Sequence, residues 1–507
     1  MNGSPARNSV RTVIAMASTG NHETVATNRI PVAVRPAAIA RMASITATTV
    51  AAFAVPAAAH VSEQALVLLL PTDVYISAGI AAVVLTVLVL AFLPGRISAG
   101  LFRTVQLPGV PVPPILSGAT SLLALALLAS LLAAGITGTR DPLGNPLPLF
   151  IWTVWWMGFV VLQGAFGNLW TWVNPFTGLG CLLASIGDQR PRLRLPERLG
   201  SWPGVGVLLA FGAFYLAYPA PDDPDRLAWT VIAYLVVTFA GMVLFGSDVW
   251  LTRCESFTML LRLYARLAPV RLGRDQSRAG FPGWGIAASE PVPPSLAVFA
   301  LVMLGVGSFD GLNETFWWLS QIGVNPLEFP GRSAIIAETV TGIIVANVAL
   351  VTVFGACVWA GLRLAQRYGQ AGETGFVEAF GRLALSIIPI AFAYHIAHFL
   401  TAFLINGQYA LVAASDPFGT GADLFGFAHM HVTAGFFNTL GSVRVIWLTQ
   451  AGAVVIGHII AILLAHAIAM DMFGSRKAAA ISQIPLATFM ILYTLLGLWL
   501  LASPRGA

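Results

Sequence analysis

The chain has 507 residues, of which 57% are hydrophobic and 10% charged, and its mean hydropathy is +0.80. This composition excludes a soluble globular protein and indicates a polytopic membrane protein. The net charge of +5 comes mainly from residues 1–59, which hold five arginines and one acid, so no basic surface for nucleic acid is predicted. Three widely separated cysteines without a CxxC pair predict neither a disulfide framework nor a thiolate metal site.

Residues 1–59 are predicted to be a disordered extension followed by a cleavable leader. An arginine-flanked apolar run ends in three alanines at 57–59, the small residues that signal peptidase recognises. Cleavage after Ala59 would make His60 the new N-terminus, and its amine and imidazole together would suit a borderline metal such as copper. In the alternative interpretation the segment stays as an uncleaved anchor and His60 is an ordinary surface residue.

Residues 60–507 are predicted to form one all-α membrane domain, a polytopic bundle of about ten transmembrane helices. A helix that crosses a bilayer needs about 20 apolar residues. The apolar runs that meet this length lie at about 74–94, 115–136, 148–167, 202–219, 227–246, 294–309, 333–359, 382–404, 443–469 and 481–501.

Arginine is concentrated in the loops after the first, third, fifth, seventh and ninth runs, so these loops are predicted to be cytoplasmic. The protein would then be a multi-pass protein of the inner membrane with its mature N-terminus outward. Residues 168–200 and 247–292 are predicted to be cytoplasmic interfacial segments, and residues 310–332 and 405–442 outward-facing loops.

Six of the eight histidines lie between residues 395 and 466, in two apolar runs and the loop between them. His395 and His398 are three residues apart, so on a helix they face the same way and could hold one metal ion. His458 lies in the next run. An ionisable group at membrane depth is costly, so a function is the default hypothesis; the alternative is a hydrogen bond to a backbone carbonyl of a neighbouring helix.

A helical rise of about 1.5 Å per residue places His395 about 20 Å and His398 about 24 Å from the entry of their span, in the outer third of the membrane. Asp310 and Glu314 are four residues apart, just beyond the sixth span, and face the same way. Imidazoles and carboxylates at one membrane face predict a divalent metal site, zinc or copper, that activates water.

The loop between the two histidine-bearing runs adds His429, His431 and Asp416 to the candidate metal ligands. For Asp416 the competing interpretation is a turn former beside Pro417. A haem b is an alternative cofactor, with His395 or His398 opposite His458, although a depth difference of about 8 Å argues against it.

Several stretches resemble bacterial polytopic membrane proteins of the fenitrothion hydrolase type. They include HVSEQALVLLLPTDVY, WLTRCESFTMLLRLYARLAP, SFDGLNETFWW and AYHIAHFLTAFLINGQYAL, and the resemblance covers most of residues 60–500. It implies hydrolysis of a P–O aryl ester in a small apolar organophosphorothioate by an inner-membrane protein, and it leaves open a second membrane subunit.

In such an enzyme a metal-bound hydroxide would attack phosphorus. His395 and His398 would be the first ligands, and His429, His431 or a carboxylate would complete the set. Asp310 or Glu314 would orient the water.

Two other functions remain open at this point. Copper handling is favoured by His60 and by Met430, which stands between two histidines. A haem- or quinone-linked redox subunit is the second. A transporter is disfavoured because the two halves of the chain show no internal repeat.

Overall fold

The computed structural model describes residues 67, 69–92, 100–110, 114–186, 191–273, 275–328, 331–367 and 374–505, all of them within the compact unit Pro56–Ala507. The predicted leader and His60 lie outside these residues. Ten helices of the described part are long and apolar enough to cross a membrane, which confirms the predicted all-α polytopic bundle.

Each predicted span coincides with one of these helices. They are α3 (Thr72–Phe92), α5 (Pro114–Thr137), the continuous α6 (Pro146–Pro148), η1 (Leu149–Phe159) and α7 (Val160–Phe166), α10 (Trp202–Ala217), α11 (Pro224–Phe245), α15 (Pro294–Asn313), α17 (Ile336–Arg367), α19 (Ile388–Ser415), α20 (Leu440–Phe473) and α21 (Arg476–Ala502). Four of them, α15, α17, α19 and α20, continue several residues beyond their predicted ends. As a result Asp310 lies inside α15 and not in the loop after it.

Shorter elements lie in the connections between spans, and two of them lead without a break into α19. They are α8 (Trp170–Val173), α9 (Pro175–Ile186), η2 (Glu197–Leu199), α12 (Ser247–Arg253), α13 (Ser256–Tyr264), α14 (Trp284–Ala287), α16 (Phe316–Gln321), η3 (Arg332–Ala334), α18 (Phe376–Leu383), η4 (Ala384–Ile387) and η5 (Gly435–Phe437). The chain also forms a small antiparallel sheet that its sequence pattern did not indicate, made of β1 (Val105–Pro108), β3 (Gln276–Ala279) and β2 (Val270–Arg271) in the order β1-β3-β2.

Side-chain caps explain where several helices begin. Asp223 accepts a hydrogen bond from the backbone N–H of Arg226 at the start of α11, and Pro224 occupies the first helical position. Glu255 accepts from the backbone N–H groups of Phe257 and Thr258 at the start of α13. These caps satisfy amide groups that the first turn of a helix leaves without partners.

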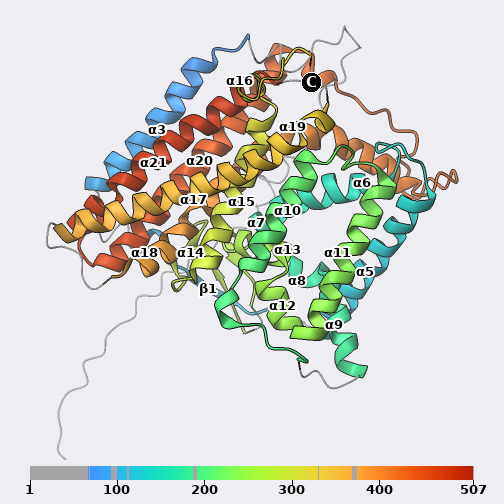
Figure 1. Cartoon of the computed structure of the whole chain (residues 1–507), viewed down its shortest axis with the longest axis horizontal. Coiled ribbons are helices and arrows are strands. Elements are labelled where there is room, and N and C mark those ends of the chain that lie inside the picture. Colours follow the sequence, from blue (N-terminus) through green and yellow to red (C-terminus); the bar gives the residue numbers. More distant parts are fainter. Residues whose placement is uncertain are drawn as a thin grey trace, which may run out of the picture. The chain divides into compact units, whose positions relative to one another are not determined.

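The helices α15 and α19 lie inside the bundle. Of their most apolar stretches 78% is buried, against 11% for α3, so α15 and α19 contact protein while α3 is open to lipid. The helix α19 packs against α20, α15 and η1, and α17, α20 and α21 run side by side (Figure 1). A polar side chain on α15 or α19 is therefore shielded from lipid.

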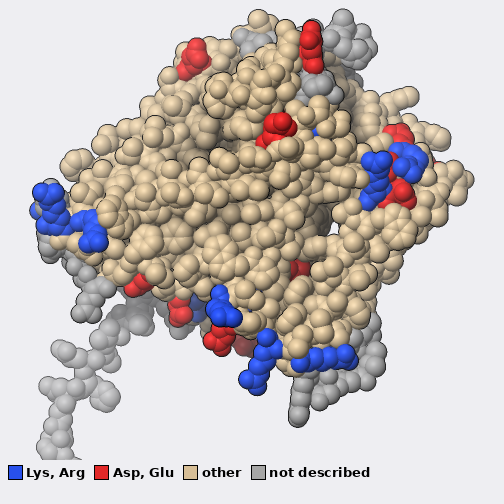
Figure 2. Space-filling view, in the orientation of Figure 1, with Lys and Arg blue, Asp and Glu red and all other residues tan. Residues whose placement is uncertain are grey.

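Charged side chains lie mostly along the margins of the face that Figure 2 shows, with a broad uncharged area between them. Aliphatic side chains on several spans remain exposed, including Leu123 at 70% and Val236 at 61%. Surface of this kind suits hydrocarbon and not water, so the bundle is a multi-pass membrane protein with the bilayer as its surroundings.

Candidate functional site

The crossing of α15 and α19 joins an acid and an imidazole that are far apart in the sequence. Asp310 Oδ2 lies 2.9 Å from His398 Nε2, and the two side chains are 11% and 10% exposed. Because an ionised carboxylate only accepts hydrogen bonds, the imidazole donates through Nε2. In the neutral ring Nδ1 then presents its lone pair, so Asp310 fixes both the orientation and the tautomer of His398.

The remaining ring nitrogen of His398 is buried and has no hydrogen-bond partner among the described residues. Tyr394 stacks on the same ring, with the ring centroids 5.7 Å apart and the planes tilted by 13°. Both side chains, together with Asp310 and His395, line a cavity of about 40 Å³. The other walls are mostly apolar, and a space of this size has room for water but for no larger ligand.

His395 lines this cavity but makes a different bond. Its Nε2 lies 2.9 Å from the backbone oxygen of Trp156, and its ring packs edge-on against Trp156 and Phe399. This is the bond to a neighbouring carbonyl that the alternative interpretation expected. Trp156 belongs to η1, an 11-residue π-helix that the spacing of its tryptophans did not predict. Such helices are rare and frequently lie at functional sites.

Glu314 follows Asp310 by one turn and ends α15. Its Oε1 lies 3.9 Å from Arg332 Nη2, and 46% of its side chain is exposed. Partial burial, and then the nearby Asp310 carboxylate, raise the pKa of Glu314. It therefore lies beside the Asp310–His398 pair, on the side that is open to solvent.

The loop after α19 uses its carboxylates to hold its own backbone. Asp416 Oδ1 accepts from the Thr420 N–H at 2.8 Å, and Asp416 Oδ2 accepts from the Gly421 N–H at 2.7 Å. These backbone N–H groups lower the pKa of Asp416, as expected for a turn former. His429 and His431 in the same loop are exposed.

His458 lies on α20, away from the His395–His398 cavity. It is 1% exposed, and its Nδ1 lies 2.8 Å from the Val454 oxygen of its own helix. Within the part of the chain that the structure describes, its Nε2 has no hydrogen-bond partner. It lines a second cavity of about 10 Å³ together with Ser308, Tyr394 and Tyr493. Tyr394 therefore borders both cavities.

Two functional candidates, Tyr394 and Tyr493, escaped the sequence reasoning. Tyr394 precedes His398 by four residues on one helix, a spacing that predicts neighbouring side chains. Tyr493 is bonded to Ser308, with 2.7 Å between the hydroxyl oxygens. A tyrosine in an apolar span is amphipathic and needs a partner, so both could have been singled out with the histidines.

The described structure offers few side chains that could bind the predicted metal ion or haem. Within the described ranges no three His, Cys, Asp or Glu side chains lie close enough to share a metal ion. A catalytic zinc site takes three protein ligands, so a metal here would need donors beyond the described arrangement. The metal ligand roles, including that of His60, stay predictions. The cavities beside His398 and His458 measure about 40 and 10 Å³, and the haem alternative also stays a prediction.

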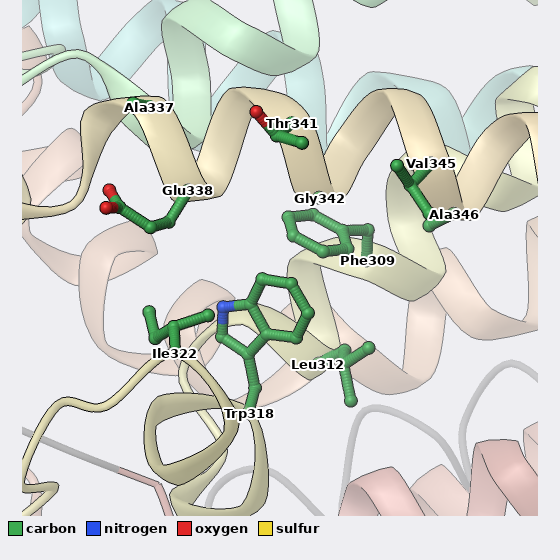
Figure 3. A pocket seen from close by; sticks show the side chains of 10 residues that line it. All are labelled: Phe309, Leu312, Trp318, Ile322, Ala337, Glu338, Thr341, Gly342, Val345 and Ala346. Atoms are coloured by element: carbon green, nitrogen blue, oxygen red, sulfur yellow. The ribbon is translucent and has the colours of Figure 1, made fainter.

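A further cavity of about 450 Å³ lies on another face of α15, between α15, α16 and α17. Figure 3 shows Trp318 and Phe309 beside each other in it, with Glu338 reaching in from α17. Phe309 and Leu312 line this cavity while Asp310 lines the smaller one, so α15 separates the two. Its walls are mostly apolar and hold no acid–base pair.

The polar centre of the bundle therefore consists of the Asp310–His398 pair, Tyr394 and the cavity that they share. His395 borders it without joining the pair. Comparison with family models, curated proteins and solved structures finds no match for this chain. The chemistry of these side chains is thus the guide to function.

Proposed function

We propose that the protein is a membrane-embedded hydrolase in which His398, held by Asp310, activates water for attack on a small apolar ester. One observation carries this proposal: His398 Nε2 lies 2.9 Å from the Asp310 carboxylate while its Nδ1 is unpartnered on a residue that lines a water-sized cavity. A base whose other nitrogen is bonded to a carboxylate is the arrangement that general-base catalysis needs.

The reaction would proceed without a charged side-chain nucleophile. A water oxygen forms the new bond to phosphorus while His398 Nδ1 takes the water proton. The P–O aryl bond breaks with its electron pair on the aryloxide, which then receives that proton from Nδ1. Asp310 stabilises the positive charge that the ring carries between these two transfers.

The setting favours an uncharged substrate. A phosphotriester is neutral and apolar, so it partitions into the bilayer around the bundle. The cavity of about 40 Å³ has room for the water alone, so only the reacting phosphorus of the ester would approach it, beside Asp310 and His398. The resemblance of the sequence to fenitrothion hydrolases supports this substrate class. With arginine-rich loops in the cytoplasm, the site would face outward across the inner membrane.

The test uses the full chain in proteoliposomes with a chromogenic aryl phosphotriester, and aryloxide absorbance as the readout. The variant His398→Gln should lower the rate by about 10²- to 10⁴-fold, the usual contribution of a positioned general base. His429→Gln makes the same change at an exposed histidine and should keep the wild-type rate. Wild-type protein without hydrolysis, or His398→Gln at full rate, would refute the proposal.

Proton transfer through the bundle is a second candidate, favoured by the place of Tyr394 between two small cavities. Asp310 and His398 lie on one cavity, and Ser308, His458 and Tyr493 lie on the other. Files of buried titratable side chains mark proton relays in membrane proteins. In proteoliposomes that hold a pH-sensitive dye, wild type should pass protons under an imposed potential and Tyr493→Phe should pass fewer. A wild-type rate equal to that of empty vesicles removes this candidate.

A further inference from the structure

The largest cavity among those described lies at the other end of α15. It measures about 760 Å³, and Leu296, in the first turn of α15, forms part of its wall. Asp310 is 14 positions further along the helix, so about 21 Å separates the two levels. The cavity is bounded mainly by the connections that hold α8, α12, α13 and β2, and not by the spans.

Three arginines line this cavity: Arg262, Arg266 and Arg271. In the described part of the chain none of them has a carboxylate oxygen within 4.0 Å. The side-chain hydrogen bond of Arg266 goes to the neutral Ser289 hydroxyl at 3.1 Å. Among the described residues, the positive charge at this wall is therefore not paired with a carboxylate.

The arginines also act on one another. Burial, and then Arg271 and Arg262, lower the pKa of Arg266; burial, and then Arg278, lower the pKa of Arg271. Like charges gathered in a partly buried place are costly unless an anion offsets them. The wall that these arginines form thus carries an excess of positive charge.

The arginine wall is held in place by its surroundings. The Arg271 guanidinium lies 4.9 Å from the centre of the Trp284 ring, and the strand pair β2–β3 fixes its backbone opposite Arg278. A Cβ on Gly285 would lie 2.6 Å from Arg271 Nη2, so the glycine leaves the space that this guanidinium occupies. The Arg271 guanidinium therefore belongs to a preformed surface and is not a free side chain.

We propose that this cavity binds a phosphate-bearing ligand at its arginine wall. Guanidinium groups match phosphate oxygens with paired N–H donors, which makes arginine the preferred residue for such recognition. Asn168 and Thr171 add neutral polar groups, and Phe166 and Leu296 add apolar surface. That mixture suits the headgroup and first methylenes of an anionic phospholipid, and the same arginines would also hold the phosphate of a soluble compound.

The experiment measures ligand-induced thermal stabilisation of the purified full chain in a non-ionic detergent, because a ligand that binds only the folded state raises Tm. The probes are phosphatidylglycerol, phosphatidylcholine and inorganic phosphate. Phosphatidylglycerol should raise Tm with saturation, and Arg266→Gln with Arg271→Gln should weaken its apparent affinity at least about tenfold. Arg363→Gln is the matched control, since Arg363 does not line the cavity.

Saturation by inorganic phosphate with the same arginine dependence would also support the site and would identify a soluble phosphate compound as its ligand. Equal effects of the two phospholipids, without any effect of phosphate, would overturn the proposal. Should the double variant fail to fold, Arg262→Gln changes an exposed side chain and Arg271→Lys keeps the charge. Wild-type affinity in both of these variants would overturn the proposal as well.

Discussion

Aspartate and histidine side chains occur both in the site between α15 and α19 and in the loop after α19. Their contacts differ between these two regions. In the first region the Asp310 carboxylate of one helix contacts the His398 imidazole of another. In the second, Asp416 accepts hydrogen bonds from amides four and five residues away, and the histidines are exposed. A buried carboxylate needs a charged or donating partner, whereas an exposed one can serve a turn.

This difference teaches that the density of histidines along the sequence does not define a site. Burial separates His398, whose ring is bonded to Asp310, from His431, whose side chain meets solvent. If this distinction governs function, the hydrolysis rates of variants in the two regions should differ by orders of magnitude.

The largest effect is expected from Asp310→Asn. The amide keeps the shape of the side chain but cannot stabilise a positive ring, so hydrolysis of a chromogenic phosphotriester should fall about 10²- to 10⁴-fold. Asp416→Asn makes the same change in the loop and should leave the rate near that of wild type. Equal losses of hydrolysis rate in the two variants would contradict the functional difference between the two regions.

A smaller effect on stability is expected from Gly311→Ala. A Cβ there would lie 1.7 Å from the Tyr394 hydroxyl, so the tyrosine that stacks on His398 must move. Overpacking of this kind costs about 1–3 kcal/mol, and thermal unfolding in detergent should show a lower Tm. Gly407→Ala on α19 meets no atom within 4 Å and should not lower Tm. A Tm for Gly311→Ala at or above that of Gly407→Ala would contradict this packing.

The loop after α19 should become less stable at low pH. The pKa of Asp416 is lowered by the Gly421 and Thr420 N–H groups, so the carboxylate stabilises the loop above its unfolded pKa of about 3.9. That contribution is lost as the pH falls through the lowered folded value. Hydrogen exchange of the Thr420 and Gly421 amides, corrected for intrinsic rates, should therefore rise at low pH. Asp416→Ala should exchange fast at every pH, and protection equal to wild type would disprove the turn role.

The smallest effect is expected at the exposed histidines. His429→Ala and His431→Ala should change the hydrolysis rate by less than about twofold, as surface substitutions usually do. Zinc and copper contents of the same preparations, measured by mass spectrometry, test the predicted metal roles of these residues. If the wild type holds a stoichiometric metal ion and either variant loses it, the active centre lies in the loop after α19 and not between α15 and α19.

The spans were predictable because a run of about 20 apolar residues has one common solution in a bilayer. The end of α15 was not predictable in this way, because Asp310 breaks the apolar pattern; in the structure Asp310 is paired with His398. The three-stranded sheet left no signal either: its strands have two to four residues, too few for an alternating pattern.

Within the candidate site, sequence reasoning found His398 and Asp310 but assigned them separate roles. Their pairing depends on how α15 packs against α19, a tertiary contact between residues 88 positions apart that helical periodicity cannot specify. His395 and His398 share a side of α19, as their spacing predicted. The neighbours decide what each does, because Trp156 offers a carbonyl to one and α15 offers a carboxylate to the other.

The most direct test of the central claim, that His398 and Asp310 act as one unit, is a double-mutant cycle on phosphotriester hydrolysis. It compares His398→Gln, Asp310→Asn and the double variant with wild type in proteoliposomes. The double variant should be no slower than the slower single variant, because removal of either residue already disables the pair. Losses that multiply would show two independent residues and contradict the account.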